Sequence, residues 1–235
     1  MVAVAYTVFG LTGFGSTVIA LPVLAHLFSL KFAVPLLLLL DFTAFVIFGA
    51  RLRKRIHYAE IAWLIPFVLA GMAAGLTLLI RVAEQKLLVV LGVFLLLYAG
   101  YGLTRRGVAV PLSRVWCAPI GLAGGALSSL FGTGGVLFAI YNAGRVRDKD
   151  ALRATNAAMI MISSMVRLLL FGAAGLLAQE GLLVSALVLL PALIGGVWLG
   201  NRLHAAVPAI AVVKAVYAVL VIAGLLILAR SLPTL

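Results

Sequence analysis

Three charged residues lie deep within long apolar stretches of the sequence: Asp41, Arg167 and Lys214. A charge inside a bilayer is costly unless it is paired or hydrated, so each is a candidate functional residue. An arginine at such a depth can bind an anion, so we expect this role for Arg167. An aspartate there can exchange a proton, so we expect this role for Asp41. The alternative is that these two residues form a structural ion pair or extend to an interface. Lys214 lies near the start of its stretch and is expected to reach the interface.

Glycine and hydroxyl residues cluster in the middle of two unusually long apolar stretches. The first cluster contains Gly13, Gly15, Ser16 and Thr17, and the second contains Gly132, Thr133, Gly134 and Gly135. We expect each cluster to interrupt a helix, so that a new helix begins near the membrane centre. A helix N-terminus has unpaired N–H groups and about half a positive charge. Two such ends meeting there predict a binding site for a small anion. The alternative is that the hydroxyls only cap their own helices.

The composition requires a membrane protein. The chain has 235 residues, of which 65% are apolar and 10% charged, and its mean hydropathy is +1.27. Soluble domains are nearer half apolar and a quarter charged, so soluble enzymes and disordered tails are excluded. Continuous apolar stretches of this length must be helical in lipid. They span residues 2–30, 32–50, 58–80, 87–103, 115–143, 151–177, 182–199 and 209–229.

The net charge and the cysteine content exclude several kinds of partner and site. The net charge is +12, but the basic residues lie between the apolar stretches, which favours membrane orientation over nucleic-acid binding. Cys117 is the single cysteine, so an intrachain disulfide and a cysteine metal cluster are excluded. The sequence has no metal-binding or phosphate-binding motif, and we expect no cofactor.

The glycines also reveal an internal repeat. Gly13 and Gly15 match Gly132 and Gly134, and a second set follows in the same order. In that set Pro66, Gly71 and Gly75 match Pro191, Gly196 and Gly200. We therefore expect one membrane domain, 1–235, built from repeats 2–103 and 115–229. The pairs four residues apart, 71/75 and 196/200, are expected to be sites of close helix packing.

The distribution of basic residues decides the orientation of the repeats. If stretches 2–30 and 115–143 each cross the membrane once, Lys and Arg are divided equally between its two sides. If each is instead a re-entrant hairpin, twelve basic residues lie inside and four outside, as the positive-inside rule favours. The inside set is Arg51, Arg53, Lys54, Arg55, Arg105, Arg106, Arg114, Arg145, Arg147, Lys149, Arg153 and Arg202, and the outside set is Lys31, Arg81, Lys86 and Arg230. The predicted fold is therefore an all-α polytopic membrane protein of two inverted four-element repeats, each a glycine-interrupted re-entrant hairpin plus three transmembrane helices.

Both repeats resemble the sulfite exporter family TauE/SafE, the TSUP transporters. The first carries Gly13-Phe-Gly-Ser-Thr-Val-Ile-Ala-Leu-Pro22 and Leu30-Lys-Phe-Ala-Val34, and the second carries Phe131-Gly-Thr-Gly-Gly135 and Arg147-Asp-Lys-Asp-Ala-Leu-Arg-Ala-Thr155. The sequence departs from the pattern at Tyr141, which stands where repeat one has Pro22, and at Ser16, where a third glycine is common.

The resemblance implies transport, usually export, of small sulfur-containing or carboxylate anions such as sulfite or organosulfonates, coupled to protons. We therefore expect a secondary transporter in the bacterial inner membrane that works by alternating access, with the lipid bilayer, protons and a small anion as partners. Two alternatives remain at this point, a passive anion channel of the same fold and a membrane-embedded component of an assembly or enzyme. The sequence does not indicate an oligomeric state.

Overall fold

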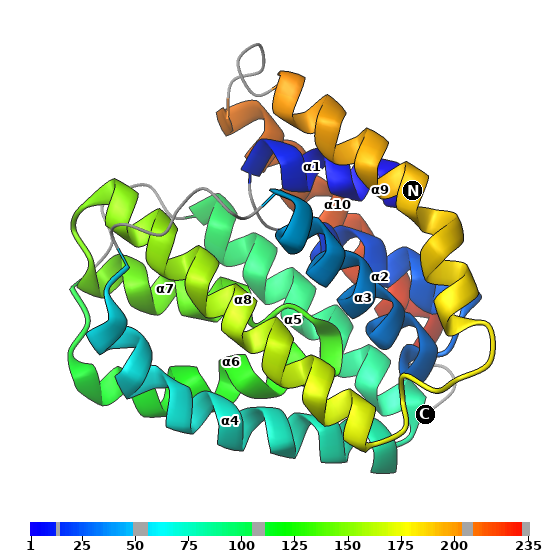
Figure 1. Cartoon of the computed structure of the whole chain (residues 1–235), viewed down its shortest axis with the longest axis horizontal. Helices are drawn as coiled ribbons and strands as arrows, with labels where there is room; N and C mark the ends of the chain where they lie inside the picture. The colour runs from blue at the N-terminus through cyan, green and yellow to red at the C-terminus, as the bar shows by residue number, and fades with distance from the viewer. Residues whose placement is uncertain (13–14, 49–55, 105–110, 204–208, 232–235) are drawn as a thin grey trace.

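The computed structural model describes residues 1–12, 15–48, 56–104, 111–203 and 209–231. These residues form ten α-helices and one short 3-10 helix, and they contain no strand. In chain order the helices are α1 (Val2–Thr12), α2 (Ser16–Leu27), α3 (Leu30–Phe48), α4 (Tyr58–Arg81), α5 (Glu84–Thr104), η2 (Arg114–Trp116), α6 (Cys117–Phe131), α7 (Gly135–Arg145), α8 (Lys149–Ala173), α9 (Leu182–Leu203) and α10 (Ala209–Ser231). Figure 1 shows them as one helical bundle.

Five of the described helices are long and apolar enough to cross a membrane. The candidate spans are Leu30–Ile47, Tyr58–Arg81, Glu84–Leu103, Asp150–Ala173 and Leu182–Leu203. They correspond to five of the six predicted full crossings. The sixth, α10, is 23 residues long, and its described side chains include the shorter apolar stretch Val216–Ser231. The chain is thus a polytopic helical membrane protein.

Both long apolar stretches are split in two at their glycine clusters. Stretch 2–30 contains α1 and α2, and stretch 115–143 contains α6 and α7. The second stretch folds back on itself, because a Cβ placed on Gly124 would lie 2.5 Å from Cε1 of Phe138. In a straight helix those residues would be roughly 21 Å apart. The first stretch also folds back, since Tyr6 and Ser16 donate to the same Asp41 oxygen, each at 2.7 Å.

Two glycine pairs pack long helices against the interrupted ones. Cβ atoms on Gly71 and Gly75 of α4 would lie 2.2 and 2.5 Å from the carbonyl oxygens of Leu122 and Ala126 in α6. On α9, Cβ atoms at Gly196 and Gly200 would lie 2.4 and 2.2 Å from the carbonyl oxygens of Ala3 and Thr7 in α1. Only glycine permits so close an approach, as expected for small-residue packing between membrane helices. The two pairs therefore make matching contacts, each with the first half of an interrupted helix.

Hydrogen bonds gather the helix ends into two groups. In one group, Leu30 N donates to Glu84 Oε1 at 2.5 Å, and Gln179 Nε2 donates to the Lys31 carbonyl at 2.8 Å. The beginning of α3, the beginning of α5 and the segment between α8 and α9 therefore lie together.

The second group contains the two ends of stretch 115–143. Leu112 N donates to the Gly144 carbonyl at 3.1 Å, and His57 N donates to Thr155 Oγ1 at 3.0 Å. Residues just before and just after the stretch are thus hydrogen-bonded, so the stretch leaves the bundle at the end where it enters.

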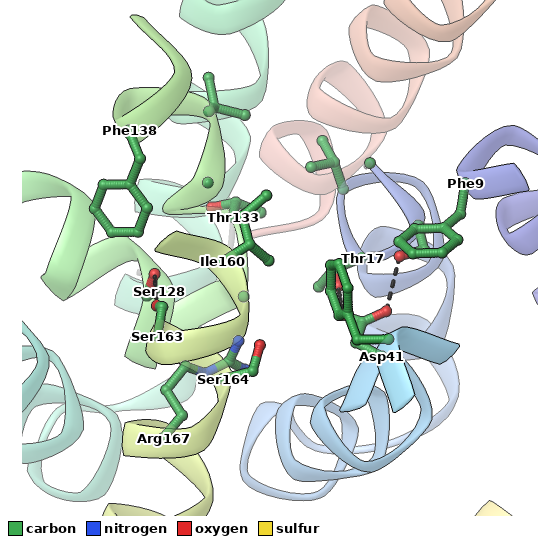
Figure 2. A pocket seen from close by; sticks show the side chains of 17 residues that line it. Phe9, Thr17, Asp41, Ser128, Thr133, Phe138, Ile160, Ser163, Ser164 and Arg167 are labelled. Atoms are coloured by element: carbon green, nitrogen blue, oxygen red, sulfur yellow. Dashed lines mark hydrogen bonds between the residues drawn. The ribbon is translucent and has the colours of Figure 1, made fainter. Parts of the chain in front are cut away.

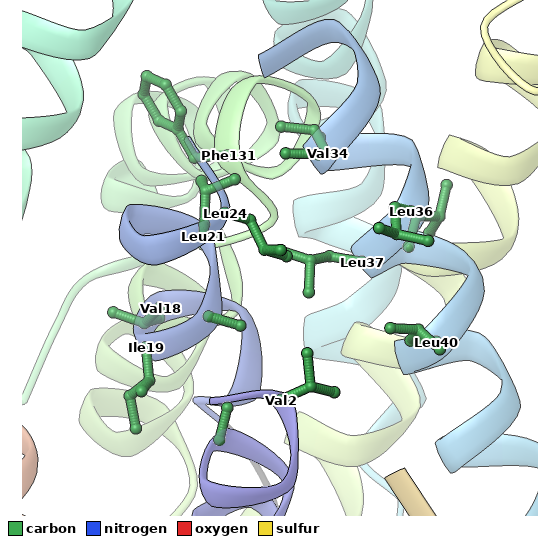
Figure 3. Packing of buried hydrophobic residues seen from close by; sticks show 14 of the residues in the cluster. Val2, Val18, Ile19, Leu21, Leu24, Val34, Leu36, Leu37, Leu40 and Phe131 are labelled. Carbon is green, nitrogen blue, oxygen red and sulfur yellow. The ribbon is translucent and has the colours of Figure 1, made fainter. Parts of the chain in front are cut away.

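The core is apolar and centres on α2 and α3. Figure 3 shows Leu21 and Leu24 of α2 facing Val34 and Leu37 of α3. These four side chains are buried within the larger of two apolar clusters. This packing fixes α2 beside α3, and it thereby places the first turn of α2 against the polar residue in the middle of α3.

Candidate functional site

A polar cavity lies where the two interrupted helices meet. Its lining comprises Phe9, Gly15, Ser16, Thr17, Val18, Asp41, Phe45, Ser128, Gly132, Thr133, Gly135, Val136, Phe138, Ile160, Ser163, Ser164 and Arg167. Figure 2 shows Thr133, Ser163 and Arg167 on one side and Thr17, Phe9 and Asp41 on the other. The cavity has a volume of about 50 Å³. It therefore has room for more than one water molecule.

On one side of the cavity, Asp41 is surrounded by hydroxyl donors. Tyr6 and Ser16 donate to Oδ1, each at 2.7 Å, and Thr17 donates to Oδ2. The carboxylate, in α3, is 8% exposed and thus holds α1 and the first turn of α2 together. Ser16 and Thr17 bond Asp41, and neither caps its own helix.

On the other side, the Arg167 side chain is buried, and two of its three nitrogen atoms have no hydrogen-bond acceptor among the described residues. It is 4% exposed, and its Nε and Nη2 atoms have no partner in the described part of the chain. Its guanidinium carbon lies 5.6 Å from the centroid of the Phe171 ring, one turn further along α8. No ion pair joins it to Asp41, although both line the cavity, so the structural ion pair considered above is absent.

The two glycine turns approach each other beside Arg167. A Cβ on Gly132 would lie 2.6 Å from Cγ2 of Thr17 and 3.4 Å from Nη2 of Arg167. Gly132 has φ 72° and Gly15 has φ 93°, a left-handed conformation that glycine adopts at no steric cost. Gly134, which matches Gly15 in sequence, has φ −60°, so the two turns differ locally. Thr133 lies in the second turn, is 2% exposed, and its hydroxyl has no hydrogen-bond partner in the described part of the chain.

The first turns of α2 and α7 both border the cavity. Ser16 and Thr17 begin α2, and Gly135 begins α7. The first N–H groups of a helix have no intrahelical acceptor. In α7 the N–H groups of Val136 and Leu137 donate to the carbonyl oxygens of Thr133 and Gly134, whereas that of Gly135 has no backbone acceptor in the described part of the chain.

Most of the predicted site residues line this cavity, but not all. Gly134 does not, because its open side faces α6, where a Cβ would lie 2.0 Å from the Gly124 carbonyl oxygen. Gly13 lies outside the described residues, as does the side chain of Lys214.

Sequence reasoning missed several residues of the site. These are Tyr6 on Asp41 and the serines Ser128, Ser163 and Ser164. Ser128 and Ser163 are 3.3 Å apart between hydroxyl oxygens. The sequence spacing could have indicated the serines of α8. Ser163 and Ser164 precede Arg167 by four and three residues, so all three lie on one face of the helix.

A separate polar cluster closes the end of the bundle near Leu112. Glu60 in α4 accepts from Arg145 Nη2 at 2.9 Å and from the Tyr141 hydroxyl at 3.0 Å. Arg114 lies 3.5 Å from the same carboxylate. Tyr141, which departs from the proline of repeat one, thus supplies a hydrogen bond that proline lacks. No group of three or more metal-ligating side chains occurs among the residues described.

The comparisons with known proteins agree with this architecture. The family model of the sulfite exporter TauE/SafE matches residues 1–227. The chain belongs to the sulfite exporter TauE/SafE family. It is also 27% identical over 193 residues to the probable inner membrane transporter protein TsaS of Comamonas testosteroni. The aligned region covers 81% of this chain and 80% of that protein. No solved structure matches it significantly.

Family membership fixes the broad class of the protein. As a member of the TauE/SafE family with five candidate spans, the chain is an integral membrane protein of the bacterial inner membrane and a transporter. The resemblance identified from the two glycine clusters is thereby confirmed.

Proposed function

We propose that this transporter is a secondary carrier for a small oxyanion, such as sulfite or the sulfonate group of an organosulfonate. The observation that carries the proposal is the buried guanidinium of Arg167, a residue that lines a small cavity and whose Nε and Nη2 lack acceptors among the described residues. A buried cation without a partner is strongly unfavourable, so a bound anion is its natural counter-ion. A guanidinium also presents paired N–H donors that suit the oxygens of such an anion.

Asp41 is the proposed proton site. It is the acidic residue among those that line the cavity, and ionisable residues inside membrane proteins commonly relay protons. Taking up a proton at Asp41 would offset the charge of an incoming anion, so that anion and proton move together.

The proposed mechanism is alternating access by two inverted halves, 2–103 and 115–229. The matching glycine contacts, α4 on α6 and α9 on α1, support two equivalent halves. The hydrogen bonds at the helix ends support inversion. They place the start of α3 at one end of the bundle and the start of α8 at the other. Inverted halves with interrupted helices at a central site are common in secondary transporters.

Membrane orientation can be tested by cysteine labelling in a Cys117→Ser background. With re-entrant hairpins, Ala83→Cys should react with an impermeant maleimide from the periplasm. Arg147→Cys should react with the maleimide only after the membrane is permeabilised. Labelling of Arg147→Cys from the periplasm would instead indicate that stretch 115–143 crosses the membrane.

Transport is tested by flux in liposomes that contain the purified protein. Sulfite, sulfoacetate and sulfate are supplied with and without a proton gradient, and protein-free liposomes are the control. We expect saturable uptake of at least one anion, exchange with anion on the far side, and stimulation by the proton gradient. The absence of both flux and binding for the three anions rejects the proposal. Ohmic, uncoupled conductance would identify a passive anion channel.

A further inference from the structure

The two helices that begin at the cavity differ in what already lies against them. At the start of α2, the hydroxyls of Ser16 and Thr17 both donate to Asp41, and Tyr6 donates from α1. A carboxylate beside a helix N-terminus is favourable, because it meets the positive end of the helix dipole. At the start of α2, the carboxylate of Asp41 therefore already occupies the place that a bound anion would take.

The start of α7 has no such partner among the described residues. The Thr133 hydroxyl, immediately before it, is buried and unbonded, and so are Nε and Nη2 of Arg167. The guanidinium lies against this turn, since its Nη2 is 3.4 Å from the position of a Cβ on Gly132. Three donor atoms without a partner in the described part of the chain thus belong to two residues that line the same side of the cavity (Figure 2). Both residues are at least nine-tenths buried.

We propose that the transported anion binds only on this second side, to Arg167, Thr133 and the N–H group of Gly135 at the start of α7. Asp41 permanently occupies the equivalent position at α2. The inference deepens the proposed function and rests on it. An anion in this place accepts from the guanidinium and from the Thr133 hydroxyl with different oxygens, so the site takes an oxyanion with at least two acceptor oxygens. A symmetric site, with substrate shared equally between both helix starts, is the alternative.

Two threonines provide a matched test. Thr17 and Thr133 both line the cavity, but the Thr17 hydroxyl is bonded to Asp41 whereas that of Thr133 is free. Valine has the shape of threonine and lacks only the hydroxyl. Thr17→Val therefore keeps the methyl group that lies beside Gly132. Thr77→Val is the control, since Thr77 is exposed on α4 and bonds the Ala73 carbonyl of its own helix.

The experiment measures binding of sulfite, sulfoacetate and sulfate to the purified protein by calorimetry, and takes the tightest of them to the variants. We expect Thr133→Val to weaken binding by about tenfold or more, the usual effect of losing a hydrogen bond to a charged group. Thr17→Val should bind the anion at least about fivefold more tightly than Thr133→Val does, because the Thr17 hydroxyl donates to Asp41 and makes no direct bond to the anion. Thr133→Ser, which restores the hydroxyl, should recover most of the affinity, and Thr77→Val should bind like the wild type.

Each outcome bears on a separate claim. Equal losses in Thr17→Val and Thr133→Val, or a larger loss in Thr17→Val, would overturn the one-sided site while leaving an anion carrier intact. Failure of the unmodified protein to bind any of the three anions instead counts against the proposed function itself. If Thr133→Val elutes as an aggregate, Thr133→Ala is compared with Thr133→Ser, and equal affinities in that pair overturn the inference.

Discussion

Asp41 and Arg167 line the same cavity and do not form an ion pair. Asp41 accepts hydrogen bonds from three hydroxyls, whereas Nε and Nη2 of Arg167 have no acceptor among the residues described. The carboxylate is therefore satisfied by the protein itself, and the guanidinium is not. This difference is the basis of our proposal that one side of the cavity binds an anion and the other a proton.

Neutralising Asp41 should separate anion binding from proton movement. In Asp41→Asn the amide keeps the shape of the carboxylate and an oxygen acceptor for Tyr6 and Ser16, so the fold should persist. Anion affinity should rise by roughly tenfold, because a like charge beside the anion is removed. Anion-driven proton uptake should be lost, as measured with a pH-sensitive dye inside liposomes. Normal proton uptake in this variant would remove Asp41 from the coupling mechanism.

Removing the buried cation should stabilise the empty protein and abolish its response to anions. Arg167→Met replaces an unpaired guanidinium by an apolar side chain of similar length. Replacing even a buried ion pair by apolar side chains is often neutral or stabilising, by about 1–4 kcal/mol, and a buried charge without a partner is less favourable still. We expect a melting temperature a few degrees above that of the wild type without ligand. Addition of sulfite should then produce no further rise, although it raises the melting temperature of a protein that binds it.

The control for this prediction is Arg202→Met. Arg202 is an exposed residue of α9 that stacks on Trp198, at 4.1 Å from guanidinium carbon to ring centroid. This variant should keep the full response to anions. A lower melting temperature in Arg167→Met without ligand would show that Arg167 has a structural role instead.

Much of the architecture could be predicted because membrane folds follow strong constraints. Apolar length indicated the helices, and glycine spacing indicated both helix breaks and both close-packing pairs. The depth of Asp41 and Arg167 within their stretches marked both as candidate site residues, and both line the cavity. These signals are local, so each could be identified without knowledge of the tertiary structure.

The partners of each site residue could not be predicted in the same way. Whether Asp41 pairs with Arg167 or with hydroxyls depends on how α1, α2 and α8 are placed around α3. Tyr6 is 35 residues from Asp41 in sequence, and nothing around it signals the contact. The role of Gly134 was likewise inaccessible, because its conformation and its neighbour in α6 follow from how the second turn folds back.

Gly134 and Gly135 should respond differently to the same substitution. A Cβ on Gly134 would lie 2.0 Å from a backbone oxygen of α6, whereas one on Gly135 would meet only the Ile160 side chain, at 3.2 Å. Gly134→Ala should therefore destabilise the protein by about 1–3 kcal/mol, as overpacking does. Gly135→Ala should fold normally and bind anions more weakly, because the methyl group enters the site. Melting temperature and anion binding measured for both variants test this, and equal stability would show that α7 can shift away from α6.

Breaking the Glu60 cluster should open the end of the bundle at which it lies. Glu60 joins α4 to Arg145 at the end of α7, and Cys117 is buried close by, in an apolar cluster with Tyr141. In Glu60→Gln the ion pairs are lost, which should destabilise this end by about 1–3 kcal/mol. As the single cysteine, Cys117 then reports the opening through its rate of reaction with N-ethylmaleimide, which should rise several-fold. Glu84→Gln, at the opposite end of the bundle, is the matched control and should leave that rate unchanged. An unaltered rate in Glu60→Gln would mean that apolar packing alone keeps this end closed.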